Sequence, residues 1–159
     1  EIQDNVFKLI GSDWALITAG TLEMYNMMTA SWGGFGVLWG KEVCFCVVRP
    51  HRYTFNFMEQ SDVFTLTFFD RQYRNILNLC GTKSGREIDK TAVEGLTPVK
   101  GEFGGVYFNE ARLVLECGKI YTHDLDPAHF IDPSIQDNYP DKDYHRMYVG
   151  EIKKCMIKE

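Results

Sequence analysis

The sequence predicts a single domain of mainly β structure with short helices, folded as a closed or split β-barrel. Short β-prone runs recur along most of the 159 residues, and the helical segments between them are brief. Neither an internal repeat nor an interdomain linker interrupts the pattern. A chain of this length buries about two thirds of its unfolded surface on folding, which is enough for a core without disulfides. We therefore expect one domain over residues 1–159.

Strands are expected where β-branched, aromatic and other apolar residues run together between turn-forming residues. The run EVCFCVV is apolar on both faces and therefore predicts a central strand. The two expected strands nearest the C-terminus are longer than those before them. The expected strands cover residues 14–20, 25–30, 42–48, 62–69, 106–123 and 144–157.

The segments between these strands predict loops and short helices. Residues 31–40 contain four of the fourteen glycines and are interpreted as a loop. TFNFMEQ, after Pro50, predicts one or two helical turns with Thr54 as a candidate N-cap. RQYRNILNLCG has apolar residues at helical spacing and predicts a helix capped by Gly81. TKSGREIDKTAVEG predicts a loop that enters a short helix.

The cysteines and the net charge indicate which cellular compartment and which classes of binding partner the protein is expected to have. Five cysteines without a CxxC pair suggest neither a disulfide framework nor a zinc ribbon, and they favour a reducing cytoplasm. No run approaches the roughly 20 apolar residues of a membrane span, and the first residues lack the pattern of a signal peptide. The first residue is not Met, which leaves room for missing N-terminal residues. The net charge of −5 argues against a general nucleic-acid-binding protein.

The charge is unevenly distributed along the chain. Residues 49–90 carry seven cationic and five acidic side chains, a balance of +2, so the remainder of the chain carries −7. Residues 122–143 contain six aspartates and a single lysine among prolines and small polar residues. We interpret this acidic stretch as a solvated surface excursion, and the cationic middle of the chain as the better candidate for a site.

Common nucleotide-binding and catalytic motifs are missing from the sequence. It contains no GxGxxG, GxxxxGK[ST], HExxH or GxSxG. HDLDPAH, residues 123–129, places two histidines and two aspartates close together. Nothing in that segment sets a coordination geometry, so a hydrated loop is favoured over a metal site.

Three short segments carry side chains suited to an anion or a polar heterocycle. NMMTASWGG places Thr29 and Ser31 on one face of an expected strand end, beside Trp32, which can cover an aromatic ring. RPHRYT offers guanidinium groups and a hydroxyl at an expected helix start, which suits a phosphate. SGREIDK adds further cations around Gly85. Each segment alone fits an ordinary strand end or a solvated loop at least as well.

Taken in this order, the three segments closely resemble the flavin reductase-like family of FMN-binding split barrels, and within it the flavoredoxin-type members. The resemblance runs from NMMTASWGG through RPHRYT and SGREIDK to the looser YHRMYVGEI, and it covers nearly the whole chain. It implies a homodimer with a noncovalent FMN at the subunit interface. Such a protein passes electrons from NADH or NADPH, or from a redox protein partner, to flavin or another acceptor.

The resemblance also implies roles for individual residues. His145 is the candidate catalytic residue, because near-neutral titration would suit a proton donor or a polar anchor, although a plain surface histidine fits equally well. The implied cofactor-binding residues are Asn26, Met28, Thr29, Ala30, Ser31 and Trp32 along the ribityl chain and ring, Arg49, Arg52, Tyr53 and Thr54 near the phosphate, and Ser84, Gly85, Arg86 and Lys90 as further phosphate or ribityl contacts.

The resulting prediction is a flavin oxidoreductase whose hydride and electron transfer belong to the flavin, so no catalytic triad is needed. Two alternatives stay open. One is an FMN-binding electron carrier, or a flavin or haem-related binding module, without NAD(P)H turnover. The other is a structural protein whose cationic segment contacts an acidic partner. Cys44 and Cys46 share one face of an apolar strand and are interpreted as core residues.

Overall fold

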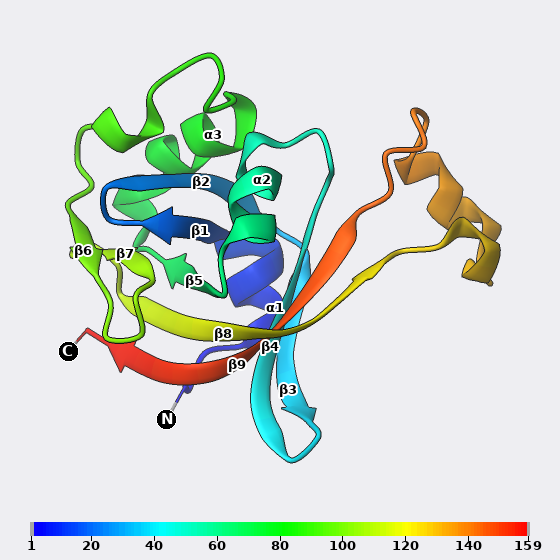
Figure 1. Ribbon diagram of the computed structural model, residues 1–159, viewed down its shortest axis with the longest axis horizontal. Coiled ribbons are helices and arrows are strands. Elements are labelled where there is room, and N and C mark those ends of the chain that lie inside the picture. Colours follow the sequence, from blue (N-terminus) through cyan, green and yellow to red (C-terminus); the bar gives the residue numbers. More distant parts are fainter. Residues whose placement is uncertain (1, 159) are drawn as a thin grey trace.

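The main feature of the fold is one curled antiparallel sheet of seven strands (Figure 1). The structure is a computed structural model and describes residues 2–158. In that range the strand order is β2–β1–β5–β8–β9–β4–β3, with a two-stranded sheet, β6–β7, beside it. The strands are β1 (Ala15–Thr21), β2 (Met24–Ala30), β3 (Gly33–Leu38), β4 (Lys41–Val48), β5 (Val63–Phe68), β6 (Pro98–Lys100), β7 (Val106–Phe108), β8 (Leu113–Asp124) and β9 (Arg146–Ile157).

Short helices surround this sheet. Of these, α3 packs on β2, while α2 contacts both β1 and β2. Across residues 2–158, no helix combines the length and the apolar character needed to cross a membrane. The helical elements are α1 (Val6–Lys8), η1 (Leu9–Asp13), α2 (Tyr53–Gln60), η2 (Arg71–Tyr73), α3 (Arg74–Thr82), η3 (Lys90–Ala92), η4 (Pro127–His129) and η5 (Pro133–Asn138). The mainly β architecture with short helices is confirmed.

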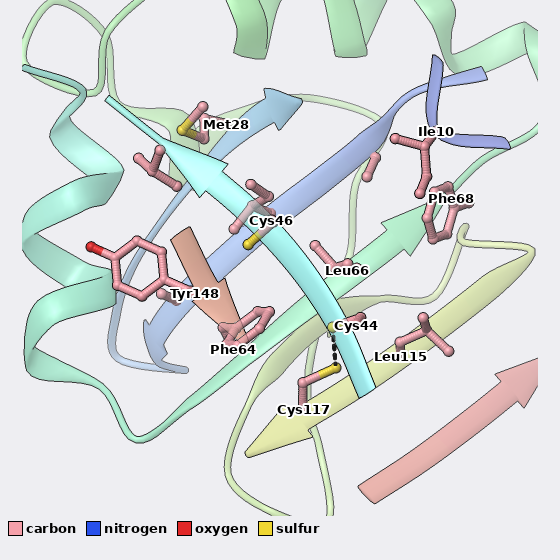
Figure 2. Packing of buried hydrophobic residues seen from close by; sticks show 14 of the residues in the cluster. Ile10, Met28, Cys44, Cys46, Phe64, Leu66, Phe68, Leu115, Cys117 and Tyr148 are labelled. Atoms are coloured by element: carbon pink, nitrogen blue, oxygen red, sulfur yellow. Dashed lines mark hydrogen bonds between the residues drawn. The ribbon is translucent and has the colours of Figure 1, made fainter. Parts of the chain in front are cut away.

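The sheet curls until β4 lies across the interior from β1 and β5 (Figure 2). The enclosed core takes buried side chains from six strands, among them Ile17, Cys44, Phe64, Leu115 and Tyr148. Each large apolar side chain buried in this way stabilises the fold by about 1.5–3 kcal/mol. The edge strands β2 and β3 are not hydrogen-bonded to each other in the described part of the chain, so the barrel is split.

The thiols of two core cysteines, Cys44 and Cys117, contact each other close to Gly150 of β9. The sulfur atoms of Cys44 and Cys117 are 3.3 Å apart, and both side chains are buried free thiols (Figure 2). A Cβ atom at Gly150 would lie 2.8 Å from the Cβ of Cys117 and 2.7 Å from the ring of Phe64, so glycine leaves the space for this contact. Burial raises the pKa of the Cys46 thiol well above its usual value. The interpretation of Cys44 and Cys46 as core residues is confirmed.

The expected loop at residues 31–40 is wrong, because most of it forms strand β3. This strand pairs with β4 in a hairpin whose two turn residues, Trp39 and Gly40, both have positive φ angles, as in a type I′ turn. Gly33 and Gly34 allow β3 to approach β4 closely, whereas Gly36 has open space around it. A Cβ atom at Gly34 would lie 2.5 Å from the ring of Phe45 on β4.

Both predicted helix caps are also wrong. The N-cap of α2 is Arg52, and Thr54 lies buried in the first turn. Helix α3 continues through Gly81 to Thr82. Because a Cβ at Gly81 would lie 3.3 Å from the Cβ of Thr29, glycine allows α3 to approach β2 closely. A third difference concerns residues 106–123, where a turn separates β7 from β8.

Candidate functional site

The first and second sequence motifs meet where β2 and β4 end. Residues at the end of β2 and just after it, together with the turn that follows β4, surround a pocket of about 240 Å³. His145 reaches the same pocket from the residue before β9. The lining residues are Met28, Thr29, Ala30, Ser31, Trp32, Val47, Arg49, Arg52 and His145.

Two neighbouring pockets hold the remaining predicted residues except one. A pocket of about 220 Å³ is lined by Arg52, Ser84 and Glu87, among others. A third, of about 380 Å³, shares Glu87 and takes in Asn26, Tyr53, Gly85, Arg86 and Lys90. Arg52 therefore links the first pocket to the second, and Glu87 links the second to the third. Thr54 lines none of these three pockets.

Arg52 and Lys90 are desolvated cations in this group of pockets, with Arg52 lining the first two and Lys90 lining the third. The Lys90 side chain, in a residue only 3% exposed, donates from Nζ to the carbonyl oxygens of Met27 and Cys80, each at 2.8 Å. Arg52 donates to the same carbonyl of Cys80 at 3.4 Å. In residues 2–158 no carboxylate lies within 4.0 Å of either cation.

Carboxylates are present near these cations, since Glu87 lines the second and third pockets and Glu23 and Asp89 line the third, but in residues 2–158 none of them pairs with Arg52 or Lys90. Burial lowers the pKa of Lys90 to about 8, and burial together with repulsion by Arg49 lowers the pKa of Arg52. Both groups are still charged at neutral pH. A buried and a half-buried positive charge with only carbonyl partners are costly, and a bound anion such as a phosphate would offset that cost.

Asn26 and Thr54 connect β2 to α2. The amide nitrogen of Asn26 donates to the hydroxyl of Thr54 at 2.7 Å, and both residues are buried. Gly85 packs directly against Asn26 and the neighbouring Tyr53. A Cβ atom there would collide with the amide oxygen of Asn26 and lie 2.5 Å from the ring of Tyr53. The third motif can therefore lie against the first two only with glycine at this position.

Arg49 binds the segment that connects β8 to β9. We call residues 125–143, which contain η4 and η5, the strap; it extends away from the ends of β8 and β9 (Figure 1). Arg49 pairs with Asp143 at 2.7 Å and donates to the carbonyl of Asn138 at 2.8 Å. His51 lies 3.2 Å from the same carboxylate. The interpretation of the acidic stretch as merely solvated is therefore wrong, since one end of it is fixed to the site.

His145 is buried, so the interpretation of it as a surface histidine is wrong. It is 8% exposed, its Nδ1 lies 2.8 Å from the hydroxyl oxygen of Tyr139, and its ring centroid is 5.1 Å from that of Trp32. Burial, aided by repulsion from Arg49, lowers the pKa of His145 to about 4. It is therefore neutral at neutral pH, which suits a hydrogen-bonding anchor better than the proton donor expected from near-neutral titration.

Sequence reasoning missed the residues that the strap brings to the site. Tyr139 and Asp143 come from a segment whose composition indicates a solvated loop. The aromatic residues within and after it, Phe130, Tyr139 and Tyr144, were the available signal, because their rings pack together at centroid distances of 5.0–6.0 Å.

The other pockets do not contain the residues expected to bind a cofactor. Pockets of about 590 and 760 Å³ lie elsewhere on the surface and contain none of the predicted site residues. In residues 2–158 no three histidine, cysteine or acidic side chains gather as a metal site would require. The three linked pockets are therefore the candidate functional site.

The comparison with protein families agrees with this site. The model of the flavin reductase like domain matches residues 7–159, and the chain belongs to this family. The predicted resemblance is thereby confirmed, and a flavin-related redox function follows from it. Comparison with curated proteins gave no match.

Solved structures share the fold. Flavoredoxin from Methanosarcina acetivorans is 22% identical with a TM-score of 0.75, covering 100% of this chain and 75% of that protein. An FMN-binding protein from Thermus thermophilus with bound p-hydroxybenzaldehyde is 18% identical, with a TM-score of 0.72 and coverage of 100% and 81%. An NADH:FAD oxidoreductase from Streptomyces globisporus C-1027, in complex with NAD and FAD fragments, is 15% identical, with a TM-score of 0.69 and coverage of 92% and 74%.

Proposed function

We propose that the chain binds FMN noncovalently and acts as an NAD(P)H-dependent flavin oxidoreductase. The observation that carries this proposal is the pair of desolvated cations, Arg52 in the first two pockets and Lys90 in the third, neither of which pairs with a carboxylate in residues 2–158. Anionic phosphate is the part of FMN that such cations would attract. The FMN-binding and NADH-dependent proteins among the structural neighbours support this choice of cofactor and donor.

The pockets suggest how the cofactor would be divided among them. Arg52, Ser84 and Arg86 would hold the phosphate, and Lys90 would supply positive charge from beneath. Residues from Thr29 to Ser31 would line the ribityl chain, and Trp32 would cover one face of the ring. Thr54 and Asn26 would act indirectly, by fixing α2 against β2. Arg49 would hold the strap in place, since its guanidinium is already paired.

The protein itself would contribute position rather than acid–base chemistry. When bound, the flavin supplies the acceptor for a hydride from NADH or NADPH and passes the electrons onward. Trp32 and His145 would orient the ring systems, and the neutral imidazole would provide a hydrogen bond without releasing a proton.

A homodimer would complete the site. The pocket beside Trp32, at about 240 Å³, is smaller than the roughly 300–1,000 Å³ of typical ligand pockets, so a single chain covers a ring incompletely. The β3–β4 hairpin begins beside this pocket, and its far end exposes Val37 (75%) and Trp39 (62%), where the Trp39 ring packs on exposed Tyr121 of β8. Exposed apolar surface of this kind is typical of an interface. We propose that a second copy of the chain covers it.

The proposal is tested by measuring FMN affinity from the quenching of flavin fluorescence. Arg52→Met should weaken binding at least tenfold, because charge-assisted hydrogen bonds contribute about 1.5–3 kcal/mol each. Arg71→Met is the matched control, since Arg71 lies on η2, outside the three pockets. Equal affinity for FMN in the wild type and Arg52→Met would contradict the assignment.

A further inference from the structure

The strap brings one buried hydroxyl group to the candidate site. Tyr139 follows η5 and is 2% exposed, packed between the ring of Tyr144 and the guanidinium of Arg49, whose carbon lies 5.0 Å from the ring centroid. Although the strap extends away from the barrel (Figure 1), the Tyr139 hydroxyl lies within hydrogen-bonding distance of His145. The contact joins the strap to the residue that precedes β9.

Counting hydrogen bonds fixes the direction of that contact. In residues 2–158, His145 Nδ1 is the sole partner of the Tyr139 hydroxyl, at 2.8 Å. If Nδ1 carried the proton, it would donate to the phenolic oxygen and leave the buried phenolic proton without an acceptor, which is costly. If Tyr139 donates instead, both groups are satisfied. The neutral imidazole then carries its proton on Nε2.

The second ring nitrogen of His145 is left for a ligand. Within residues 2–158 Nε2 has no hydrogen-bond partner, and His145 lines the same pocket as Trp32. An N–H group beside an indole ring suits a ligand that combines a flat aromatic system with a carbonyl oxygen or ring nitrogen at its edge.

We propose that Tyr139 is a positioning residue that holds His145 as the neutral Nε2–H tautomer, so that the imidazole presents a fixed donor to a carbonyl-bearing heteroaromatic ring. The tautomer follows from the protein alone. The ligand class deepens the proposed function, because flavin and nicotinamide both belong to it, and that part rests on the proposed function.

The charges around His145 favour its neutral form. Arg49, Arg52 and His51 face it and oppose a positive imidazolium, while Asp143 favours one; burial is the largest effect. Arg49 also pairs with Asp143, which offsets the attraction of that carboxylate. The imidazole therefore remains a hydrogen-bond donor at Nε2 across the neutral range rather than changing charge during a catalytic cycle.

The direct test is nitrogen-15 NMR of the histidine rings in the full chain without flavin, where protonated and unprotonated ring nitrogens have distinct shifts. The proposal predicts that His145 is protonated on Nε2 and not on Nδ1 at pH 7. In Tyr139→Phe the pKa of His145 should rise, because the lost hydrogen bond stabilised the neutral ring. Tyr144→Phe is the matched control, since its hydroxyl bonds to Gln136 instead, and it should leave the His145 shifts unchanged.

Ligand binding provides the second readout. Tyr139→Phe should weaken FMN or NAD(P)H binding about three- to tenfold, the loss expected for one oriented hydrogen bond. His145→Gln, whose amide nitrogen approximates Nε2, should retain more affinity than His145→Asn. A wild-type His145 protonated on Nδ1 would overturn the proposal, and this measurement needs no variant to fold. If the tautomer is as predicted but no flavin binds, the proposed function fails and the role of Tyr139 stands.

Discussion

The ammonium group of Lys90 lies 2.8 Å from the carbonyl oxygen of Met27, so a buried charge joins the third sequence motif to the first. The same group also bonds the carbonyl of Cys80 near the end of α3. Lys90 thus fixes the arrangement of β2, α3 and the segment after α3. It also places a positive charge where the phosphate of FMN is proposed to bind.

Replacing Lys90 by Met should therefore reduce both stability and cofactor affinity. The two carbonyl groups would lose their donor, which costs about 1–3 kcal/mol in the free energy of unfolding. FMN affinity should fall about tenfold because the site loses one positive charge. Urea denaturation and flavin titration measure the two effects, with Lys100→Met, at an exposed position on β6, as the control. An unchanged FMN affinity in a folded Lys90→Met protein would remove Lys90 from the site.

Gly85→Ala should disturb the site through packing alone. The added Cβ would collide with the amide oxygen of Asn26 and press on the ring of Tyr53, which forces the segment around residue 85 outward. Overpacking of this kind costs about 1–3 kcal/mol. Gly36→Ala is the control, because a Cβ there meets no atom within 4 Å. If thermal stability and FMN affinity were the same in both variants, the close approach at Gly85 would be unimportant.

The burial of His145 predicts a specific pH dependence of stability. Its pKa is about 4 in the fold and about 6.5 when unfolded, so between these values the unfolded chain binds more protons. The free energy of unfolding should consequently fall as the pH drops from about 6.5 to about 4, by at most about 3 kcal/mol from this group.

Denaturation of wild type and His145→Gln across this pH range isolates that contribution. The variant should show a shallower decline, because it lacks the titrating group. His129→Gln, at an exposed histidine of the strap, should follow the wild type. Parallel curves for wild type and His145→Gln would show that His145 titrates normally.

Trp39→Glu should weaken self-association. The side chain is exposed at the tip of the β3–β4 hairpin, and a carboxylate there would have to be desolvated in the proposed interface. Light scattering coupled to size-exclusion chromatography should show a dimer for wild type and a larger monomer fraction for the variant. Ile131→Glu, at a fully exposed position on the strap, should remain dimeric. A monomeric wild type at micromolar concentration would contradict the proposed dimer.

The features that sequence reasoning located well are those encoded over a few residues. The change from VCFCVV to RPHR marks the end of β4, because apolar residues give way to cations at once. The placement of Trp32, Arg52 and Ser84 around linked pockets was accessible because each belongs to a short motif. Family resemblance added the order in which these motifs meet.

The features that were missed depend on contacts with other chain segments, some near and some far in the sequence. Gly81 has the sequence of a helix cap, and only the proximity of Thr29 shows that it permits close packing. The glycines of β3 have the composition of a loop, and only pairing with β4 makes them a strand. The contact of Tyr139 with His145 requires the strap to turn back, which no local pattern indicates.

The central claim is most directly tested by the absorption spectrum of the protein after it is loaded with FMN, freed of excess cofactor, and treated anaerobically with NADH and then NADPH. The account predicts retained flavin bands that bleach with at least one of the two donors. Bands that are retained but never bleach would contradict the oxidoreductase and indicate a carrier reduced by another protein. Absence of retained flavin, together with no NAD(P)H oxidation when free FMN is supplied, would contradict flavin binding itself.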